Sequence, residues 1–250
     1  MASAVEISCD LGEAGDAVGR AVEAALWPLV DAANVACGGH AGDRESMAEA
    51  VRRAGELGVV LGAHPSYPDR EGFGRRRIGI APEALREALV GQIALLRRLA
   101  TEGGVRLDRV KPHGALYNEA HHDADLAEMV VAAAGDVDRD LALVAAPGSM
   151  LLERARAAGL RVVREAFADR RYAADGSLVP RGRAGALLLD PVEAAAQALG
   201  LARDGGVVTE EGTPLAIAFD TLCVHGDMEG AVERLQAIRR ALGRGEASSR

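Results

Sequence analysis

Lys111 is the only lysine in this 250-residue chain, although lysine and arginine together number 29. An ammonium is a compact point charge whose pKa shifts readily on burial, so it can serve in acid–base or oxyanion chemistry to which a guanidinium is poorly suited. Lys111 ends an apolar run and lies two residues before His113. This position favours a chemical role for both side chains. The alternative is a biased codon usage that spared one surface lysine.

Ionisable residues also end other short apolar runs. The segment Asp10-Leu-Gly-Glu13 places two carboxylates around a glycine, which suits metal binding or general-base chemistry, although a simple turn would also produce it. Four of the six histidines occupy comparable positions, whereas His121 and His122 precede an expected helix start and are interpreted as solvated. The candidate set is Asp10, Glu13, His40, His64, Lys111, His113, Glu165, Asp169, His225 and Asp227.

Seven apolar runs are predicted to be strands, and most segments between them have helical periodicity. Residues 82–100 form the clearest helix, which Pro82 opens, and further helices are expected to open at Asp190 and to cover residues 227–242. The predicted strands are residues 5–10, 34–40, 59–64, 110–113, 141–146, 160–165 and 221–227.

This alternation of strands and helices predicts an α/β fold with a parallel sheet, and a length of about 250 residues favours a closed or distorted β/α barrel. Residues 1–242 are expected to form this single domain, and residues 243–250 a disordered tail. The loops after the strand carboxyl ends form the reactive face of such folds. The candidate residues should therefore converge there despite their separation in sequence.

Composition narrows the classes of partner and compartment. A net charge of −8 and an aromatic content of 3% disfavour nucleic acid. No apolar run approaches the roughly 18 residues needed to span a membrane. An odd number of cysteines and an N-terminus without a basic and apolar leader favour a cytoplasmic protein. Cys9, Cys37 and Cys223 are interpreted as small buried hydrophobes rather than as thiolate nucleophiles.

Two further segments allow alternative interpretations. Asp43 suits an N-cap for a helix running to Leu57 at least as well as it suits a catalytic role. Residues 167–181 are polar and rich in turn-forming residues. They are interpreted as a lid over the site rather than as an ordinary excursion, because Asp169 and Arg170 directly follow a predicted strand.

Several of these segments together resemble the signature blocks of the LamB/YcsF family, to which the A subunit of 5-oxoprolinase belongs. The resemblance runs in the family's order from about residue 5 to residue 242. The blocks are Ser8-Cys-Asp-Leu-Gly-Glu13, Ala33-Asn-Val-Ala-Cys-Gly-Gly-His-Ala-Gly-Asp43, Gly62-Ala-His-Pro65, Gly72-Phe-Gly-Arg75, Val110-Lys-Pro-His-Gly-Ala-Leu-Tyr-Asn118, Glu165-Ala-Phe-Ala-Asp-Arg170, Asp175-Gly-Ser-Leu-Val179 and Cys223-Val-His-Gly-Asp227.

The resemblance implies the distorted seven-stranded barrel of the glycoside hydrolase and deacetylase group. It also implies ATP-dependent opening of the lactam ring of 5-oxo-L-proline to L-glutamate, in a complex with two further subunits. The sequence has no Gly-x-x-x-x-Gly-Lys-[Ser/Thr] phosphate loop, since Pro112 follows its one lysine. An ATP site is therefore expected to be atypical or to belong mainly to the partners, with this chain performing the hydrolytic step.

Roles follow from charge on that hypothesis. Lys111 and His113 would stabilise the oxyanion or the leaving phosphate, and Asp10 or Glu13 would activate water. His40 and His64 would orient that water or, with Asp10, bind a divalent metal. The residues expected to line the substrate are Asn118, Glu165, Asp169, Arg170, His225 and Asp227. The alternatives are a metal-dependent amidohydrolase or deacetylase that works without ATP, and a non-catalytic scaffold that binds the lactam.

Overall fold

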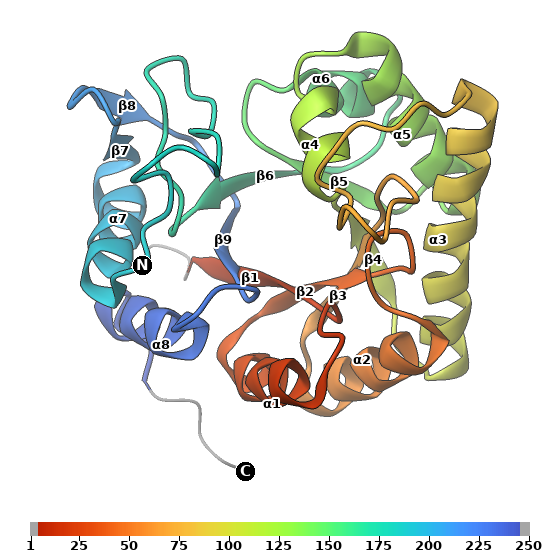
Figure 1. The fold of residues 1–250 in the computed structure, drawn as a ribbon, viewed down its shortest axis with the longest axis horizontal. Helices are drawn as coiled ribbons and strands as arrows, with labels where there is room; N and C mark the ends of the chain where they lie inside the picture. Colours follow the sequence, from red (N-terminus) through yellow and green to blue (C-terminus); the bar gives the residue numbers. More distant parts are fainter. Residues whose placement is uncertain (1–4, 246–250) are drawn as a thin grey trace.

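The computed structural model describes residues 5–245, and its centre is a closed barrel of seven parallel strands. The strand order around the barrel is β1-β2-β3-β4-β5-β6-β9, and the helices lie outside it (Figure 1). This is the distorted seven-stranded β/α barrel that the sequence predicts. The strands are β1 (Glu6–Leu11), β2 (Ala32–Ala36), β3 (Val60–His64), β4 (Leu107–Val110), β5 (Ala142–Ala145), β6 (Val162–Phe167) and β9 (Thr221–His225).

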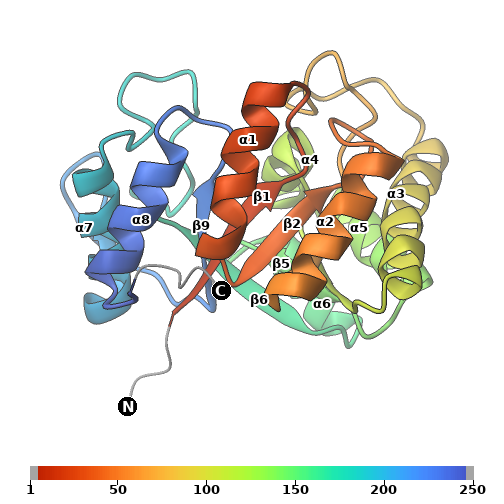
Figure 2. The same ribbon diagram turned by 90° about the horizontal axis from the view of Figure 1, so that it is seen from below.

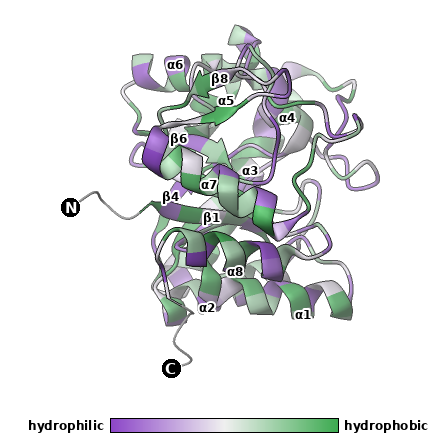
Figure 3. Cartoon of the chain, turned by 90° about the vertical axis from the view of Figure 1, so that its left-hand side faces the viewer, coloured by the Kyte–Doolittle hydropathy of each residue, from purple (hydrophilic) through white to green (hydrophobic). Residues whose placement is uncertain are grey.

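The helices connect successive strands and pack apolar faces on the barrel. In α3 the leucines and the isoleucine of the apolar face are all buried, and along α2, α7 and α8 hydrophilic and hydrophobic residues alternate (Figure 3). The helices are α1 (Ala17–Leu26), the 3-10 turn η1 (Trp27–Leu29), α2 (Arg44–Leu57), α3 (Pro82–Glu102), α4 (Gly114–Ala120), α5 (Ala124–Val137), α6 (Met150–Ala157), α7 (Pro191–Asp204) and α8 (Ala231–Ala241). Among the described residues, no helix is long and apolar enough to cross a membrane.

Three details differ from the sequence-based expectations. Strands β2, β4 and β9 end before His40, Lys111 and Asp227, so these residues lie in the loops that follow. Strand β4 begins at Leu107 and shares only Val110 with the predicted strand 110–113, although the backbone N–H of Lys111 still donates to Ala63 at 2.9 Å. Helix α8 begins at Ala231 and not at Asp227, since Gly230 adopts a left-handed conformation directly before it. A short antiparallel pair, β7 (Gly206–Val208) and β8 (Pro214–Ala216), was not predicted. Of the predicted tail, residues 246–250 lie outside the described residues.

The barrel interior is polar, and the sequence did not indicate this. Arg109 on β4 donates to Glu6 on β1 at 2.6 and 3.1 Å, and these strands are not neighbours, so the pair crosses the interior. Gly62 on β3 leaves room for this arrangement: a Cβ there would lie 2.9 Å from the Arg109 side chain and 2.9 Å from the amide oxygen of Asn34. Charged groups thus fill the space inside the strands, while the hydrophobic core lies between strands and helices.

Candidate active site

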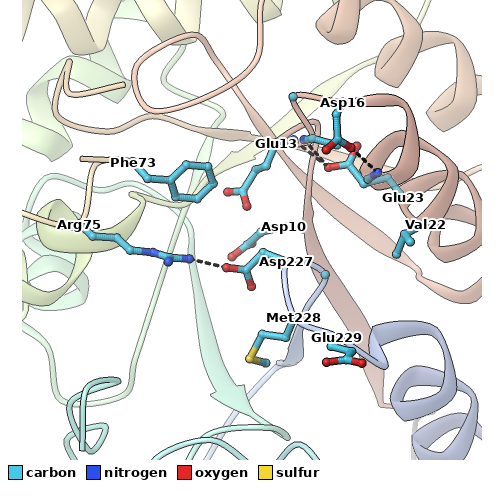
Figure 4. Close-up of a pocket in the computed structure, with 14 residues that line it drawn as sticks. Asp10, Glu13, Asp16, Val22, Glu23, Phe73, Arg75, Asp227, Met228 and Glu229 are labelled. Carbon is cyan, nitrogen blue, oxygen red and sulfur yellow. Dashed lines mark hydrogen bonds and ion pairs between the residues drawn. The ribbon is translucent and has the colours of Figure 1, made fainter. Parts of the chain in front are cut away.

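The carboxyl ends of the strands surround the candidate residues. The long loops after β3 and β6 rise on the same side of the barrel (Figure 2). A cavity of about 500 Å³ opens there, and a second cavity of about 540 Å³ adjoins it and shares Asp10, Glu13, Arg75 and Asp227 with it. Figure 4 shows the carboxylates of Asp10, Glu13 and Asp227 directed into this space. A volume of this size admits a small organic ligand.

Lys111 is buried in the barrel and contacts three acceptors. Its Nζ lies 3.0 Å from Asp10 Oδ1, 2.8 Å from Glu165 Oε1 and 3.3 Å from Cys223 Sγ. Burial alone would lower its pKa, but Asp10, Cys223 and Glu165 outweigh burial and hold the pKa of Lys111 well above its ordinary value. The interpretation of Lys111 as a surface charge is therefore wrong. The ammonium is a fixed positive charge in a desolvated centre.

The two carboxylates of the first motif have different environments. Asp10 accepts hydrogen bonds from Lys111 and from the Asn34 amide at 2.9 Å. Burial would raise its pKa, but His64 and Lys111 hold the pKa of Asp10 well below its ordinary value. Burial raises the pKa of Glu13 to about 7. The backbone amide of Glu13 donates to Glu23 on α1 at 2.8 Å, which fixes the turn that aims this carboxylate.

Three histidines meet next to Glu13, and backbone carbonyls define the orientation of two of them. Nδ1 of His64 is 2.7 Å from the carbonyl oxygen of Lys111, and Nε2 of His113 is 2.9 Å from the carbonyl oxygen of Phe73. A carbonyl only accepts, so both of these nitrogens carry protons. The other nitrogens, His64 Nε2 and His113 Nδ1, face each other at 3.0 Å. A proton on one of the two rings, or a bound cation, keeps these two nitrogens from facing each other as lone pairs. Asp10 outweighs burial and raises the pKa of His64, whereas burial lowers the pKa of His113, so the proton is favoured on His64.

His40 completes this group, which we call the imidazole cluster: Glu13, His40, His64 and His113. His40 Nε2 is 2.9 Å from Glu13 Oε1, and its ring stacks on that of His113 at 3.7 Å. Burial lowers the pKa of His40 to about 2, so its ring is neutral. One ligand atom from each of the four residues lies within 4.8 Å of the others.

The donor set of the imidazole cluster fits a divalent metal such as zinc. Neutral imidazoles and a carboxylate are its usual ligands, and ligating histidines normally donate their second N–H to a carbonyl, as His64 and His113 do. The sequence-based set of Asp10, His40 and His64 overlaps with this cluster in its two histidines. Asp10 lies 3.3 Å from His64 Nε2, but it is occupied by Lys111 and Asn34.

The loop 72–75 packs against the imidazole cluster. The sequence-based prediction assigned no functional role to this loop. The Phe73 ring lies edge-on to His40 and His113, with centroids 5.2 and 5.4 Å away. Gly74 has φ +62°, and a Cβ there would lie 2.9 Å from His40 Cβ and 3.1 Å from His113 Cδ2. The Gly72-Phe-Gly74 motif was the available signal for this contact, because only glycine permits both the backbone conformation and the close approach.

A second histidine site lines the same cavity. Asp169 accepts from His225 twice, from its backbone N–H at 2.7 Å and from Nδ1 at 2.9 Å. Burial would raise the pKa of Asp169, but His225 outweighs it and lowers the pKa. Because Nδ1 carries the proton in this contact, Nε2 of a neutral His225 is a proton acceptor. The ring stacks on Phe167, at 5.6 Å between centroids.

Of the residues expected to line the substrate, Glu165 and Asp169 are 0% exposed and are not among the residues that line the cavity, whereas the other four line it. Asn118 is exposed at the rim, and Arg170 is buried in its wall. Residues 177, 178, 180 and 181 of the expected lid also line it. His121 and His122 lie at the rim. Both were predicted to be solvated; His122 is exposed, as predicted, whereas His121 is half-buried.

The structure also decides between the alternatives for Asp43 and for the three cysteines. Asp43 forms a capping box with Ser46 at the start of α2, which confirms the structural interpretation. Cys9, Cys37 and Cys223 are all buried, and burial raises the pKa of each thiol.

Fold and site together define a β/α barrel protein whose buried lysine, carboxylates and imidazoles gather at the carboxyl ends of the strands. The chain belongs to the LamB/YcsF family, whose model matches residues 5–249. It is 47% identical over 242 residues to the 5-oxoprolinase A subunit of Methylococcus capsulatus, covering 97% of this chain and 93% of that protein. It is 46% identical to the Bordetella pertussis protein of the same name, covering 98% and 97%. The lactam utilization protein from Thermus thermophilus superimposes with a TM-score of 0.88 at 41% identity, covering 96% of both chains.

Proposed function

We propose that this chain is the hydrolytic subunit of an ATP-dependent 5-oxoprolinase, which opens the lactam ring of 5-oxo-L-proline to L-glutamate together with two further subunits in the cytoplasm. One observation carries the proposal. A chain nearly half identical over its whole length to proteins named as the A subunit of 5-oxoprolinase gathers a buried ammonium, several carboxylates and an imidazole cluster around one cavity.

The chemistry explains the need for partners. A five-membered lactam is a resonance-stabilised amide, and its opening requires an activated carbonyl or an external source of energy. This chain lacks the phosphate loop that would hold ATP. We therefore assign activation of the lactam by phosphate from ATP to the partner subunits. In the hydrolytic step, one water adds to the activated carbonyl carbon and the ring C–N bond breaks as the nitrogen takes up its protons, which leaves an acyl phosphate. A second water then replaces the phosphate, which leaves, and the carboxylate of L-glutamate remains.

Each role is assigned by position and charge. The ammonium of Lys111 stabilises negative charge on the carbonyl or phosphate oxygen, displacing the weakly accepting thiol of Cys223 as its third contact. His113 is assigned to the imidazole cluster and not to direct contact with this charge, because its Nε2 already donates to Phe73 and burial lowers its pKa, which keeps the ring neutral. Asp10 and Glu13 are the candidates for activating water. His225, held by Asp169, is placed to exchange a proton with the substrate at its Nε2.

The imidazole cluster would hold a divalent metal in this proposal. The metal, when bound, would lower the pKa of its water from about 15.7 to about 7. The same cluster favours a second candidate function, a metal-dependent amidohydrolase or deacetylase that acts without ATP, because Glu and His ligands are those of hydrolytic zinc sites.

Reconstitution tests these alternatives. Glutamate formation from 5-oxo-L-proline is measured with this chain, the two partner subunits and ATP, and with each component omitted. We expect glutamate only from the complete mixture. Steady ATP-independent turnover by this chain alone would establish the amidohydrolase instead, and a full rate from the partners alone would establish a non-catalytic scaffold. Asp10→Asn should abolish turnover, whereas Asp43→Asn, which keeps a capping side chain on α2, should not change it.

A further inference from the structure

Among the described residues two buried arginines, Arg170 and Arg234, have no carboxylate partner, and of these two only Arg170 lines the cavity. It is 7% exposed and lines the 500 Å³ cavity, but within residues 5–245 no carboxylate forms an ion pair with it. The adjacent Asp169 directs both of its oxygens at His225. By contrast, the guanidinium of Arg109, equally buried, is matched by Glu6 and Asp108. An unmatched buried charge is costly, and a ligand anion would relieve that cost.

The guanidinium of Arg170 has free hydrogen-bonding capacity. Its Nη2 donates to the carbonyl oxygen of Val179 at 2.8 Å, which anchors the side chain, while its buried Nε has no acceptor. A guanidinium presents five N–H donors in a fork that matches a carboxylate. The anchored side chain is therefore preorganised, with donors left over.

Other charges reinforce the positive character of this wall. Arg75, Arg170 and Arg181 all line the cavity, and Arg75 and Arg181 share the single carboxylate of Asp227. Three guanidiniums thus have one carboxylate among them. Burial and then the neighbouring Arg181 lower the pKa of Arg170 to about 10, so the two positive charges repel each other. An anion bound between them would remove this repulsion.

We propose that Arg170, assisted by Arg181, is the anion subsite that holds the carboxylate of the lactam substrate. The inference rests on the proposed function, because it takes that substrate to be 5-oxo-L-proline. The carboxylate is the part of this molecule that ring opening leaves unchanged, so binding it fixes the ring without opposing the reaction. The Phe167 ring lines the same cavity and offers an apolar surface to the lactam methylenes.

Comparison of 5-oxo-L-proline with 2-pyrrolidinone, the same ring without the carboxylate, tests the subsite. Calorimetric titration of this chain, alone and in the complex, should show 5-oxo-L-proline binding at least about tenfold more tightly, the scale of one charge-assisted hydrogen bond. Arg170→Gln should weaken 5-oxo-L-proline to the level of 2-pyrrolidinone and leave 2-pyrrolidinone binding unchanged. The matched control is Arg171→Gln, since Arg171 is adjacent but contacts Glu193 outside the residues that line this cavity. It should keep the wild-type preference.

Several results would overturn the assignment. One is a folded Arg170→Gln variant that still prefers 5-oxo-L-proline over 2-pyrrolidinone as strongly as the wild type does. Another is a wild-type chain that does not prefer 5-oxo-L-proline. Inorganic phosphate distinguishes the second source of an anion. If Arg170→Gln loses phosphate binding but keeps the wild-type preference for 5-oxo-L-proline, the subsite takes a phosphoryl group instead. If Arg170→Gln does not fold, Arg181→Gln decides by the same comparison, with a smaller loss expected. Glutamate formation by the wild-type complex reports on the proposed function independently of this preference.

Discussion

Replacing Lys111 by methionine should destabilise the protein as well as inactivate it. The substitution keeps the approximate length of the side chain but removes the ammonium that contacts Asp10 and Glu165 at 3.0 and 2.8 Å. These two residues are 8% and 0% exposed, so water cannot replace the lost charge. Two buried acids would then face each other without a cation between them.

The magnitude follows from this burial. Removing one partner of a buried ion pair costs about 3–5 kcal/mol, because the other charge is left uncompensated. For a domain of this size, 1 kcal/mol corresponds to roughly 2–4 °C in melting temperature, so the melting temperature should fall by about 6–20 °C. Protonation of Glu165, whose pKa burial already raises, would bring the loss toward the lower end. Turnover of the complex should fall by about 10²-fold or more.

Thermal unfolding by circular dichroism measures this prediction, with Arg98→Met on the exposed face of α3 as the control, expected to stay within about 0.5 kcal/mol of wild type. The double variant Lys111→Met/Glu165→Gln should recover part of the loss, since it removes one of the uncompensated charges. A melting temperature within about 2 °C of wild type for Lys111→Met would refute the assignment of a buried charge centre. Lys111→Arg keeps the charge but has to fit a planar fork into the same contacts, so wild-type turnover from it would also contradict the argument.

Three other predictions concern the imidazole cluster and its surroundings. The purified chain should contain close to one equivalent of divalent metal by elemental analysis, and chelation should abolish glutamate formation by the complex while the circular dichroism spectrum is retained; full activity after exhaustive chelation would exclude a required metal. Gly74→Ala should lower metal content and turnover, because the backbone there has φ +62° and the added Cβ pushes on the imidazole cluster. Gly79→Ala is the control: its added Cβ has no neighbouring atom within 4 Å, so metal content and turnover should not change. Equal behaviour of the two variants would disprove the packing argument. Asp169 has a lowered pKa in the folded state, so its stabilising contribution is present above its ordinary pKa of about 3.9 and is lost as the pH falls through its pKa in the folded protein. The melting temperature of Asp169→Asn should therefore lie below that of the wild type at pH 7. If the difference between the two melting temperatures does not narrow toward pH 3, this result would speak against the contact with His225.

The sequence by itself determined which residues could react and on which face they would gather. The apolar runs correctly predicted seven barrel strands, and most of the ionisable residues at their ends line one cavity, because parallel strands of a barrel all end on the same side. The other three, His40, Glu165 and Asp169, contact residues that line it. The uniqueness of Lys111 marked the centre of the site. These signals are local, since burial and strand formation leave their pattern within a few neighbouring residues.

Only the tertiary structure decided the partners. Lys111 meets Asp10 across 101 residues of chain, and the order of the two in sequence contains no information about this contact. Closure of the barrel through the pairing of β1 with β9 brings Asp10 beside His225. The turn after β1 brings Glu13 to His40 and His113, whereas Asp10 is the nearer carboxylate to His64. The charge of each group then depends on which neighbours lie within a few ångströms in a desolvated interior. That dependence explains why the sequence indicated the candidate residues but not their grouping. The grouping is the buried Lys111 with its two carboxylates, the imidazole cluster and the proposed anion subsite.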